Sequence, residues 1–363
     1  MYDILISGYY GFENSGDDAI LMAILDSLRT YKKDIKILVL SKNPEETKRI
    51  YGVDTAYRFN FSEVMKAMKN SKLFLNGGGN LIQDESSTRS LMYYLATIWM
   101  AKKLGLKVML YSNGIGAINK KINRLITSRV INEADIITLR EEKSLKELES
   151  LHITKPQVLV TADPAFTLAP CSDEETSSIL AAEGIVKNKP LVGISVRKWK
   201  NFQSYIKQVA EAADYMVEKL KVQPVLIPMH YPHDVDICHT IASMMKHQPI
   251  IIKNKYSVSQ TLGIIKSMDM IIGMRLHALI YGASLQVPVL GLIYDPKVEG
   301  FLEYINQPSA GNVEDLNYEH LIQSIENVWD NRYQIKEQLS VSKQLFVDKA
   351  LQNAEIAIEL LNK

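Results

Sequence analysis

Short β-branched runs alternate with amphipathic helical runs along most of this 363-residue chain. This alternation restricts the fold more than any other feature, because strand–helix–strand units build a parallel sheet that helices cover on both faces. In the first half, strands are expected at residues 3–7, 35–40, 72–76, 107–112, 135–139 and 157–160. In the second half, they are expected at residues 190–196, 224–229, 249–253, 269–273 and 287–292.

A composition break separates the two series of strands. Residues 163–178 (DPAFTLAPCSDEETSS) combine two prolines with acidic and small polar residues, and the first half of this segment is interpreted as a linker. After about residue 313 the pattern is helical only. We therefore expect an N-terminal Rossmann-like domain over 1–168, a second one over 169–312, and helices over 313–363 that pack back on the first domain. This is the α/β architecture of GT-B glycosyltransferases, in which ligands bind beyond the carboxyl ends of the strands, in the cleft between the domains.

Charge and cysteine usage exclude several protein classes. Forty-two basic and 41 acidic residues leave a net charge of +1, so nothing in the global field points to nucleic acid. The cysteines, Cys171 and Cys238, are too few and too far apart for a disulfide scaffold, and they fit a reducing cytoplasm. No signal-peptide pattern is present at the start, and the longest apolar stretch, 270–294, is interrupted by charged residues and proline. We expect a cytoplasmic protein that meets the inner face of a membrane, if at all, from its surface.

Motifs of metal and cofactor enzymes are missing. There is no HExxH, Walker lysine or GxSxG. His230 and His233, with Asp234 or Asp236, give only weak evidence for a metal pair. Neither a metal nor a redox cofactor is expected.

Two glycine-rich turns follow strands in the first half. The segment ISGYYGFENSGDDAI (6–20) has a glycine spacing that matches neither the dinucleotide nor the P-loop pattern. Its helix begins near Asp17 and Asp18, which would repel a phosphate but can hydrogen-bond sugar hydroxyls. In LNGGGNLIQDE (75–85), three consecutive glycines indicate close approach of a ligand, with a tight turn as the alternative. A third turn, YSNGIGAINKK (111–121), is equally well explained as a simple turn.

The segment GMRLHALIYGAS (273–284) carries the strongest indication of a site. Arg275 and His277 fall at the start of a helix directly after a strand, where the helix dipole and free N–H groups favour an anion. Arginine can also clamp such an anion through two donors. Lys297 follows His277 by twenty residues, at the end of the next strand, so it can reach the same edge. Arg140 and Arg197 each close a strand too; an ion pair with Glu141 or Glu142, or a capping role, is the alternative for Arg140.

In this order, GYYGFENSGDDAI, NGGGNLIQD, YSNGIG, GMRLHALIYGAS and IYDPKVEGF resemble the polysaccharide pyruvyl transferases. The chain looks closest to the bacterial enzymes that pyruvylate cell-wall polysaccharide for S-layer attachment. The resemblance implies a GT-B-like fold, phosphoenolpyruvate as donor, and a cyclic pyruvyl ketal on a sugar, ManNAc, of a lipid-diphosphate-linked precursor. It implies donor-side roles for Arg140, Arg275, Leu276, His277 and Lys297, with Arg197 as the alternative to Arg140. The acceptor would contact Gly11, Asn14, Asp17, Asp18, Gly77, Gly78, Gly79, Asn80 and Asp84.

The residues suit this chemistry. His277 can act as the general acid that protonates the methylene carbon of phosphoenolpyruvate, since an imidazolium gives up a proton readily near pH 7. Arginine and lysine would hold the carboxylate and the phosphate. Asp17, Asp18 and Asp84 are candidates for the base that activates the sugar hydroxyl.

A basic window stands apart from these motifs. No acidic residue lies between Glu85 and Glu133, whereas Tyr93, Tyr94, Trp99 and eight basic residues do: Arg89, Lys102, Lys103, Lys107, Lys120, Lys121, Arg124 and Arg129. Two solvated helix faces would explain the window, as would a surface that meets an anionic membrane or a lipid diphosphate carrier.

Two other functions remain open from the sequence. A GT-B glycosyltransferase that uses a nucleotide sugar would suit the same fold and glycine turns. A sugar- or anion-binding module of a wall-assembly complex, without catalysis, is the second alternative.

Overall fold

The computed structural model describes residues 1–85, 87–200 and 202–363. The chain divides into two compact units. The first comprises Met1–Leu168 and Leu345–Lys363, and the second comprises Ala169–Gln344. The units are described separately below.

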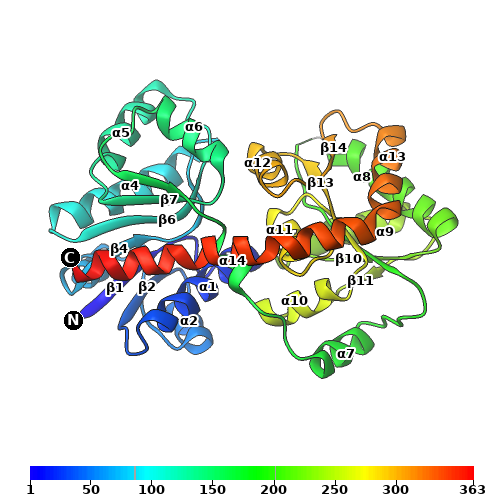
Figure 1. The fold of residues 1–363 in the computed structure, drawn as a ribbon, viewed down its shortest axis with the longest axis horizontal. Coiled ribbons are helices and arrows are strands. Elements are labelled where there is room, and N and C mark those ends of the chain that lie inside the picture. Colours follow the sequence, from blue (N-terminus) through cyan, green and yellow to red (C-terminus); the bar gives the residue numbers. More distant parts are fainter. Residues whose placement is uncertain (86, 201) are drawn as a thin grey trace. The chain divides into compact units, whose positions relative to one another are not determined.

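The first unit is built on a parallel sheet with the strand order β3-β2-β1-β4-β6-β7-β8, and the short β5 pairs with β6 (Figure 1). Its strands are β1 (Tyr2–Ser7), β2 (Ile37–Ser41), β3 (Asp54–Tyr57), β4 (Ser71–Asn76), β5 (Gly79–Ile82), β6 (Lys107–Ile115), β7 (Ile136–Leu139) and β8 (Gln157–Val160). Its helices are α1 (Ser15–Tyr31), α2 (Pro44–Tyr51), α3 (Phe61–Lys69), α4 (Thr88–Lys103), α5 (Lys121–Ile131) and α6 (Glu142–Ser150), with a 3₁₀ turn at Pro164–Thr167.

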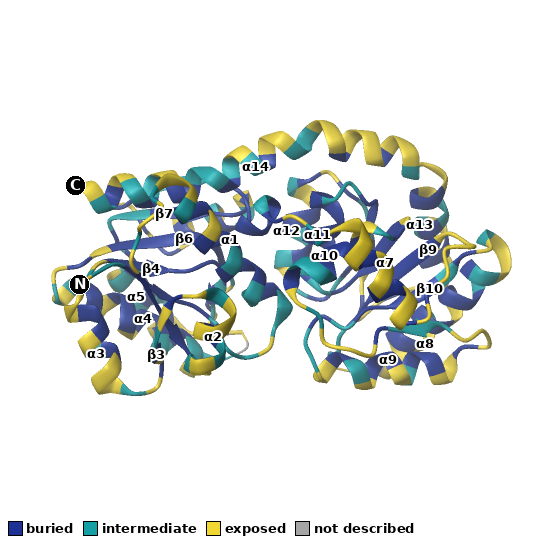
Figure 2. Ribbon diagram, turned by 90° about the horizontal axis from the view of Figure 1, so that it is seen from below, coloured by how far each residue is buried: buried dark blue, intermediate teal, exposed yellow. Residues whose placement is uncertain are grey.

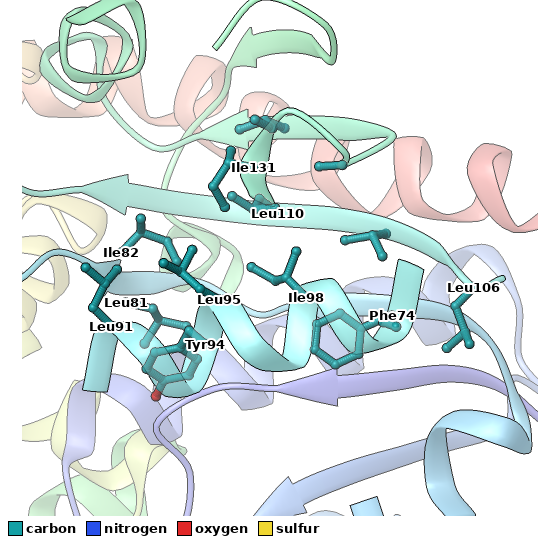
Figure 3. Packing of buried hydrophobic residues seen from close by; sticks show 14 of the residues in the cluster. Phe74, Leu81, Ile82, Leu91, Tyr94, Leu95, Ile98, Leu106, Leu110 and Ile131 are labelled. Carbon is teal, nitrogen blue, oxygen red and sulfur yellow. The ribbon is translucent and has the colours of Figure 1, made fainter. Parts of the chain in front are cut away.

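Both faces of this sheet are covered by apolar side chains. Because successive strand residues point to opposite faces, Leu5 of β1 belongs to the core cluster that includes residues of α3, α4, α5 and α6, whereas Ile4 and Ile6 belong to the cluster that includes α1. Figure 3 shows the first of these layers, with Leu91 and Ile98 of α4 directed toward the strands. Burial on both faces explains why the strands are continuous apolar runs.

The second unit repeats this plan with the order β11-β10-β9-β12-β13-β14. Its strands are β9 (Leu191–Ser195), β10 (Gln223–Leu226), β11 (Ile250–Ile251), β12 (Met270–Gly273), β13 (Val289–Ile293) and β14 (Ser309–Asn312). Its helices are α7 (Asp173–Ala182), α8 (Phe202–Tyr215, extended by a π-helical turn at Met216–Leu220), α9 (His233–Met244), α10 (Val258–Lys266), α11 (Leu276–Ser284), α12 (Pro296–Tyr304) and α13 (Tyr318–Asp330). The long α14 (Arg332–Asn362) begins in this unit and ends in the first.

In each sheet the strand order reverses at one point. The reversal lies between β1 and β4 in the first unit and between β9 and β12 in the second. Connections leave such a pair of neighbouring strands in opposite directions, which opens a crevice at their carboxyl ends where ligands of α/β proteins bind. These two points are where functional residues are to be sought.

The predicted α/β class with two parallel sheets and a C-terminal helix is confirmed. Three short strands were missed: β3, β5 and β14. The helical tail expected over residues 313–363 is not a unit of its own, because residues 313–344 belong to the second unit and residues 345–363 to the first. Figure 2 shows the physical reason at the end of the chain, where buried residues alternate with exposed ones along α14. Ala354, Ala357 and Leu360 pack into the core beside α1.

Candidate functional site

Polar residues from four adjacent strands gather at the carboxyl edge of the second sheet. The strands β10, β9, β12 and β13 are consecutive in the sheet, and all of them are parallel. The residues that follow them are, in the same order, Asp234, Arg197, Arg275 with His277, and Tyr294 with Lys297. Arg197 and Arg275 therefore flank the point where the strand order reverses.

Arg275 is held by a buried carboxylate. Its Nε lies 2.9 Å from Oδ2 of Asp234, and its Nη2 donates to Oδ1 of the same residue. Asp234 also accepts from the backbone N–H groups of Met229 and His230, at 3.1 and 2.9 Å. The bidentate contact fixes the plane of the guanidinium. Arg275 is consequently oriented before any ligand binds.

His277 lies in the first turn of α11. Arg275 is the residue that precedes this helix, and no side chain caps it by a hydrogen bond. The backbone of Met274 is tied to β9 by a hydrogen bond of 2.8 Å to the carbonyl of Ser195. Leu276 is buried, His277 is half-buried, and the His277 ring lies edge-on to Tyr281 with the centroids 6.1 Å apart. The positive end of the helix dipole thus lies where the sequence predicted an anion.

Arg197 is bordered by aromatic rings. Its Nη1 donates to the Tyr294 hydroxyl at 3.3 Å, and its guanidinium carbon lies 5.0 and 5.5 Å from the ring centres of Tyr294 and Trp199. Its Nε is buried and has no hydrogen-bond partner within the described part of the chain. The Tyr205 hydroxyl donates to the carbonyl of Arg197, which fixes the loop. Arg197 differs from Arg275 in that no carboxylate of the described residues pairs with it.

Tyr294 connects Arg197 to Lys297. The Lys297 ammonium lies 5.3 Å from the centre of the Tyr294 ring and 3.1 Å from Oδ2 of Asp295. Burial raises the pKa of the Tyr294 phenol, but Lys297 and Arg197 outweigh it, so this pKa lies below its ordinary value. Burial lowers the pKa of Lys297, but Tyr294 and Asp295 outweigh it and leave this pKa raised. Lys297 and Tyr294 therefore each favour the charged form of the other.

The opening loop of the first unit lies at the other reversal point. Asn14 caps α1 by accepting from the N–H of Gly16 at 3.1 Å. Gly11 has φ +77°, and a Cβ there would lie 2.4 Å from Oγ of Ser41, so only glycine fits against the end of β2. Asp17 and Asp18, both half-buried, stand in the first turn of the helix.

The three consecutive glycines are explained by packing. A Cβ at Gly77 would lie 2.3 Å from the Tyr10 hydroxyl, and one at Gly78 would lie 2.9 Å from Cγ2 of Ile20. Gly79 has φ +98°, starts β5, and would place a Cβ 3.5 Å from Oδ1 of Asp17. The glycine run is therefore required by the fold itself, and contact of the acceptor with Gly77, Gly78, Gly79 and Asn80 stays a prediction.

Asp84 has a structural environment. Its carboxylate accepts from the N–H groups of Asn119 and Lys120 at 2.8 and 3.1 Å, and from Nδ2 of Asn123 at 2.7 Å. Burial raises its pKa, but these hydrogen bonds outweigh burial and hold the pKa below its ordinary value. A carboxylate so engaged is a weak proton acceptor, and Asp84 does not suit the role of base.

Arg140 lies in the first unit, buried between two carboxylates. Its Nε is 3.0 Å from Oε2 of Glu141, and its Nη1 is 3.1 Å from Oδ2 of Asp163. The ion pair with Glu141 was the alternative left open from the sequence. An anion at Arg140 would have to compete with both carboxylates, whereas no carboxylate of the described residues pairs with Arg197.

Two residues at the carboxyl edge of the second sheet were not predicted as site residues. Tyr294 reads in the sequence as the last residue of a strand, and only its position between Arg197 and Lys297 distinguishes it. Asp234 was considered as a metal ligand, but its carboxylate is taken by Arg275. The sequence did contain a hint that Asp234 belongs to this site, since Asp234 follows β10, which lies two places from β12 in the sheet.

Two searches cover residues 1–85, 87–200 and 202–363. They contain no group of three or more His, Cys, Asp or Glu side chains that could hold a metal ion. None of their helices has the length and apolar content needed to cross a membrane.

Sequence comparison identifies relatives of the chain. The family model described as polysaccharide pyruvyl transferase matches residues 14–296. The amylovoran biosynthesis protein AmsJ of Erwinia amylovora is 23% identical over 400 residues, which cover 93% of this chain and 94% of AmsJ.

Solved structures share the fold at low identity. MnaA of S. aureus, solved with UDP, has a TM-score of 0.70 at 14% identity and covers 100% of this chain and 98% of its own. The UDP-GlcNAc 2-epimerase of Neisseria meningitidis, solved with UDP-GlcNAc, has a TM-score of 0.66 at 13% identity and covers 100% of both chains. HepE of Anabaena, solved with UDP, has a TM-score of 0.66 at 12% identity, over 99% of this chain and 100% of its own. At these identities the likeness shows the GT-B-like fold alone.

Proposed function

Because the chain belongs to the polysaccharide pyruvyl transferase family, we propose that it transfers the pyruvyl group of phosphoenolpyruvate to two hydroxyls of one sugar, as a cyclic ketal, and releases phosphate. The proposed acceptor is ManNAc in a lipid-diphosphate-linked cell-wall polysaccharide precursor. One observation carries the donor side of this proposal: Arg197, Arg275, His277 and Lys297 come from three adjacent strands and gather at one reversal point.

The donor is a small trianionic molecule, and the cations of this edge suit it. Arg197, which no described carboxylate neutralises, is the first candidate for the phosphate or the carboxylate of phosphoenolpyruvate. Arg275 is oriented by Asp234, and the N–H groups at the start of α11, including that of Leu276, add donors for an anionic oxygen. Lys297 stays protonated beside Tyr294 and stabilises negative charge on the leaving phosphate.

The proposed reaction begins with proton transfer from His277 to the methylene carbon, which leaves positive charge on the carbon that bears the carboxylate. A sugar hydroxyl attacks that carbon and loses its proton to a base. The carbon–oxygen bond to phosphate then breaks, and the second hydroxyl closes the ring. One phosphoenolpyruvate and one diol thus yield one ketal and one phosphate. Asp17 or Asp18 is proposed as the base, since Asp84 is held by three hydrogen-bond donors.

The test measures acceptor-dependent phosphate release from phosphoenolpyruvate with a panel of lipid-linked and soluble saccharides that includes ManNAc. His277→Asn should lower kcat by about 10²–10⁴-fold, the usual contribution of general acid–base catalysis. His239→Asn, on α9, is the matched control and should leave kcat unchanged. If the His277→Asn variant kept full activity, His277 would not be the general acid.

A nucleotide-sugar glycosyltransferase is the second candidate, because structural neighbours were solved with UDP, UDP-glucose or UDP-GlcNAc. Release of UDP from a UDP-sugar, without phosphate release from phosphoenolpyruvate, would favour it. A chain that turns over neither donor but binds saccharide would be the non-catalytic module.

A further inference from the structure

The outer faces of α4 and α5 form a surface that the proposed reaction does not use. It consists of Arg89, Trp99 and Lys103 on α4, and of Lys121, Ile122, Leu125 and Arg129 on α5; we call it the basic–apolar face. Trp99, Ile122 and Leu125 are 50%, 60% and 49% exposed. Soluble proteins rarely expose several large apolar side chains together on adjacent helices, so this surface needs an explanation.

The core does not need these side chains. The inner face of α4 already buries Leu91, Leu95 and Ile98 against the sheet (Figure 3). At α5 the inner position is occupied by Ile131. Trp99, Ile122 and Leu125 lie outside this layer and face solvent.

The face is a fixed surface. The two helices pack against each other, and both follow parallel strands of one sheet. Their N-terminal ends are joined, since Nζ of Lys120 lies 2.8 Å from Oγ1 of Thr88. Asp84 binds Asn119, Lys120 and Asn123 and so anchors the start of α5 to the strand end before α4.

The charge on this face has one sign. Neither α4 (TRSLMYYLATIWMAKK) nor α5 (KINRLITSRVI) contains an acidic residue. Lys102 and Arg124 are paired with Asp135 and Glu147, at 2.8 and 3.4 Å. The remaining bases of the two helices are exposed and have no ion pair among the described residues: Arg89, Lys103, Lys121 and Arg129.

We infer that the basic–apolar face docks the protein on the surface of an anionic lipid bilayer. Exposed basic residues are attracted to anionic headgroups. Tryptophan and aliphatic side chains beside them enter the boundary between headgroups and acyl chains. A polyanion such as nucleic acid would match the cations but would leave Ile122 and Leu125 in water. The bilayer accounts for both halves of the surface, and docking would bring the enzyme to a lipid-linked acceptor. The inference does not depend on the catalytic proposal, because its test measures binding.

The experiment is flotation of the full chain with vesicles of phosphatidylglycerol and phosphatidylcholine, compared with vesicles of phosphatidylcholine alone. The wild type should float with the anionic vesicles only, and less at high salt. The combined variant Arg89→Gln, Lys103→Gln, Lys121→Gln and Arg129→Gln should bind at least about tenfold more weakly. Trp99→Ala with Leu125→Ser should weaken binding at high salt, where apolar insertion dominates.

A variant with the same change of charge elsewhere controls for net charge: Lys187→Gln, Lys189→Gln, Lys219→Gln and Lys336→Gln, all exposed residues of the second unit. It should bind vesicles like the wild type. Circular dichroism melting confirms that each variant is folded. Equal binding to neutral and anionic vesicles, or equal losses in the two charge variants, would overturn the inference. A third result would also overturn it: single-stranded DNA at an equal concentration displaces the chain from the vesicles, and the apolar substitutions have no effect on vesicle binding.

Discussion

At the scale of single residues, the same local pattern leads to different environments. Arg140 and Arg197 each follow a buried strand; two glutamates come next after Arg140, and a lysine and a tryptophan come next after Arg197. Arg140 meets two buried carboxylates, whereas Arg197 meets two aromatic rings and a phenol hydroxyl. Glu141 and Trp199 are close to these arginines in sequence, whereas Asp163 and Tyr294 are distant. The packing of the strands adds Asp163 to the local pair of Arg140 with Glu141, and it places Tyr294 beside Arg197.

This contrast predicts that replacing arginine by glutamine has different effects at the two positions. Arg140→Gln leaves Glu141 and Asp163 buried without their cation, so it should lower the free energy of unfolding by about 3–5 kcal/mol. Arg197→Gln should leave stability nearly unchanged and raise KM for phosphoenolpyruvate about ten- to hundredfold, the effect of losing a hydrogen bond to a charged group. Chemical denaturation and steady-state kinetics measure the two. If the Arg140→Gln variant were stable and had a raised KM for phosphoenolpyruvate, Arg140 would again be a candidate ligand of the donor.

Tyr294 is predicted to position Arg197. Tyr294→Phe keeps the ring but removes the hydroxyl that accepts from Nη1. We expect a KM for phosphoenolpyruvate raised several-fold, a kcat changed less, and a melting temperature near that of the wild type. Tyr304→Phe, on the neighbouring helix α12, serves as the control. If kcat fell by more than about a hundredfold at unchanged KM, Tyr294 would take part in the chemistry itself.

At the scale of elements, long apolar strands and capped helices follow from the sequence, and short or irregular ones do not. The alternation identified the central strands of both sheets, since burial on two faces requires continuous apolar runs. It missed β3 and β14, which are four-residue edge strands, and β5, which starts at a glycine with positive φ. Asp84 was assigned to the acceptor because it follows a glycine turn. Its hydrogen bonds instead join that turn to the start of α5.

The role of Asp84 has a pH signature. Its pKa in the folded chain lies below the ordinary 3.8, so its carboxylate contributes stability above about pH 3.8 that is lost as the pH falls through the lower folded value. Asp84→Asn should therefore lower the free energy of unfolding at pH 7, by about 1.5–3 kcal/mol. The difference from the wild type should shrink below pH 3.8. Urea titrations at several pH values measure this, with Glu85→Gln, at an exposed neighbour, as the control. A difference that did not shrink as the pH fell below 3.8 would contradict the role.

At the scale of the whole molecule, the end of the chain belongs to the core of the first unit. Asn353 is fully buried; it accepts from Oγ1 of Thr161 at 2.9 Å and donates to the carbonyls of Ala162 and Ala350. Phe346 stacks on Phe166 with the ring centres 5.0 Å apart. The heptad-like pattern of residues 332–362 predicts a helix but does not say where its apolar side packs.

Removing the buried amide should destabilise the first unit. Asn353→Ala removes the hydrogen bonds of the buried amide with Thr161, Ala162 and Ala350 and opens a small cavity, which should cost about 1–3 kcal/mol of unfolding free energy. Glu359→Ala, on the exposed side of the same helix, should cost less than about 0.5 kcal/mol. Hydrogen exchange locates the effect: faster exchange is expected in α1 and in the 3₁₀ turn at Pro164–Thr167, with the strands of the second unit unchanged. Exchange that rose only in the second unit would refute this placement of α14.

The sequence by itself determined the α/β class, the two parallel sheets, the family and the turns that carry the candidate site residues. These properties depend on local periodicity, on glycines that no other residue can replace, and on the order of motifs along the chain. The tertiary structure decided which charges are neutralised: Arg140 by Glu141 and Asp163, Arg275 by Asp234, and Arg197 by none of the described carboxylates. It also decided that Gly77 and Gly78 pack against Tyr10 and Ile20, while Gly79 takes a positive φ. Except for Glu141, which is next to Arg140, strand order brings these partners together across tens of residues, and strand order is set by the packing of the whole sheet, which no local pattern records.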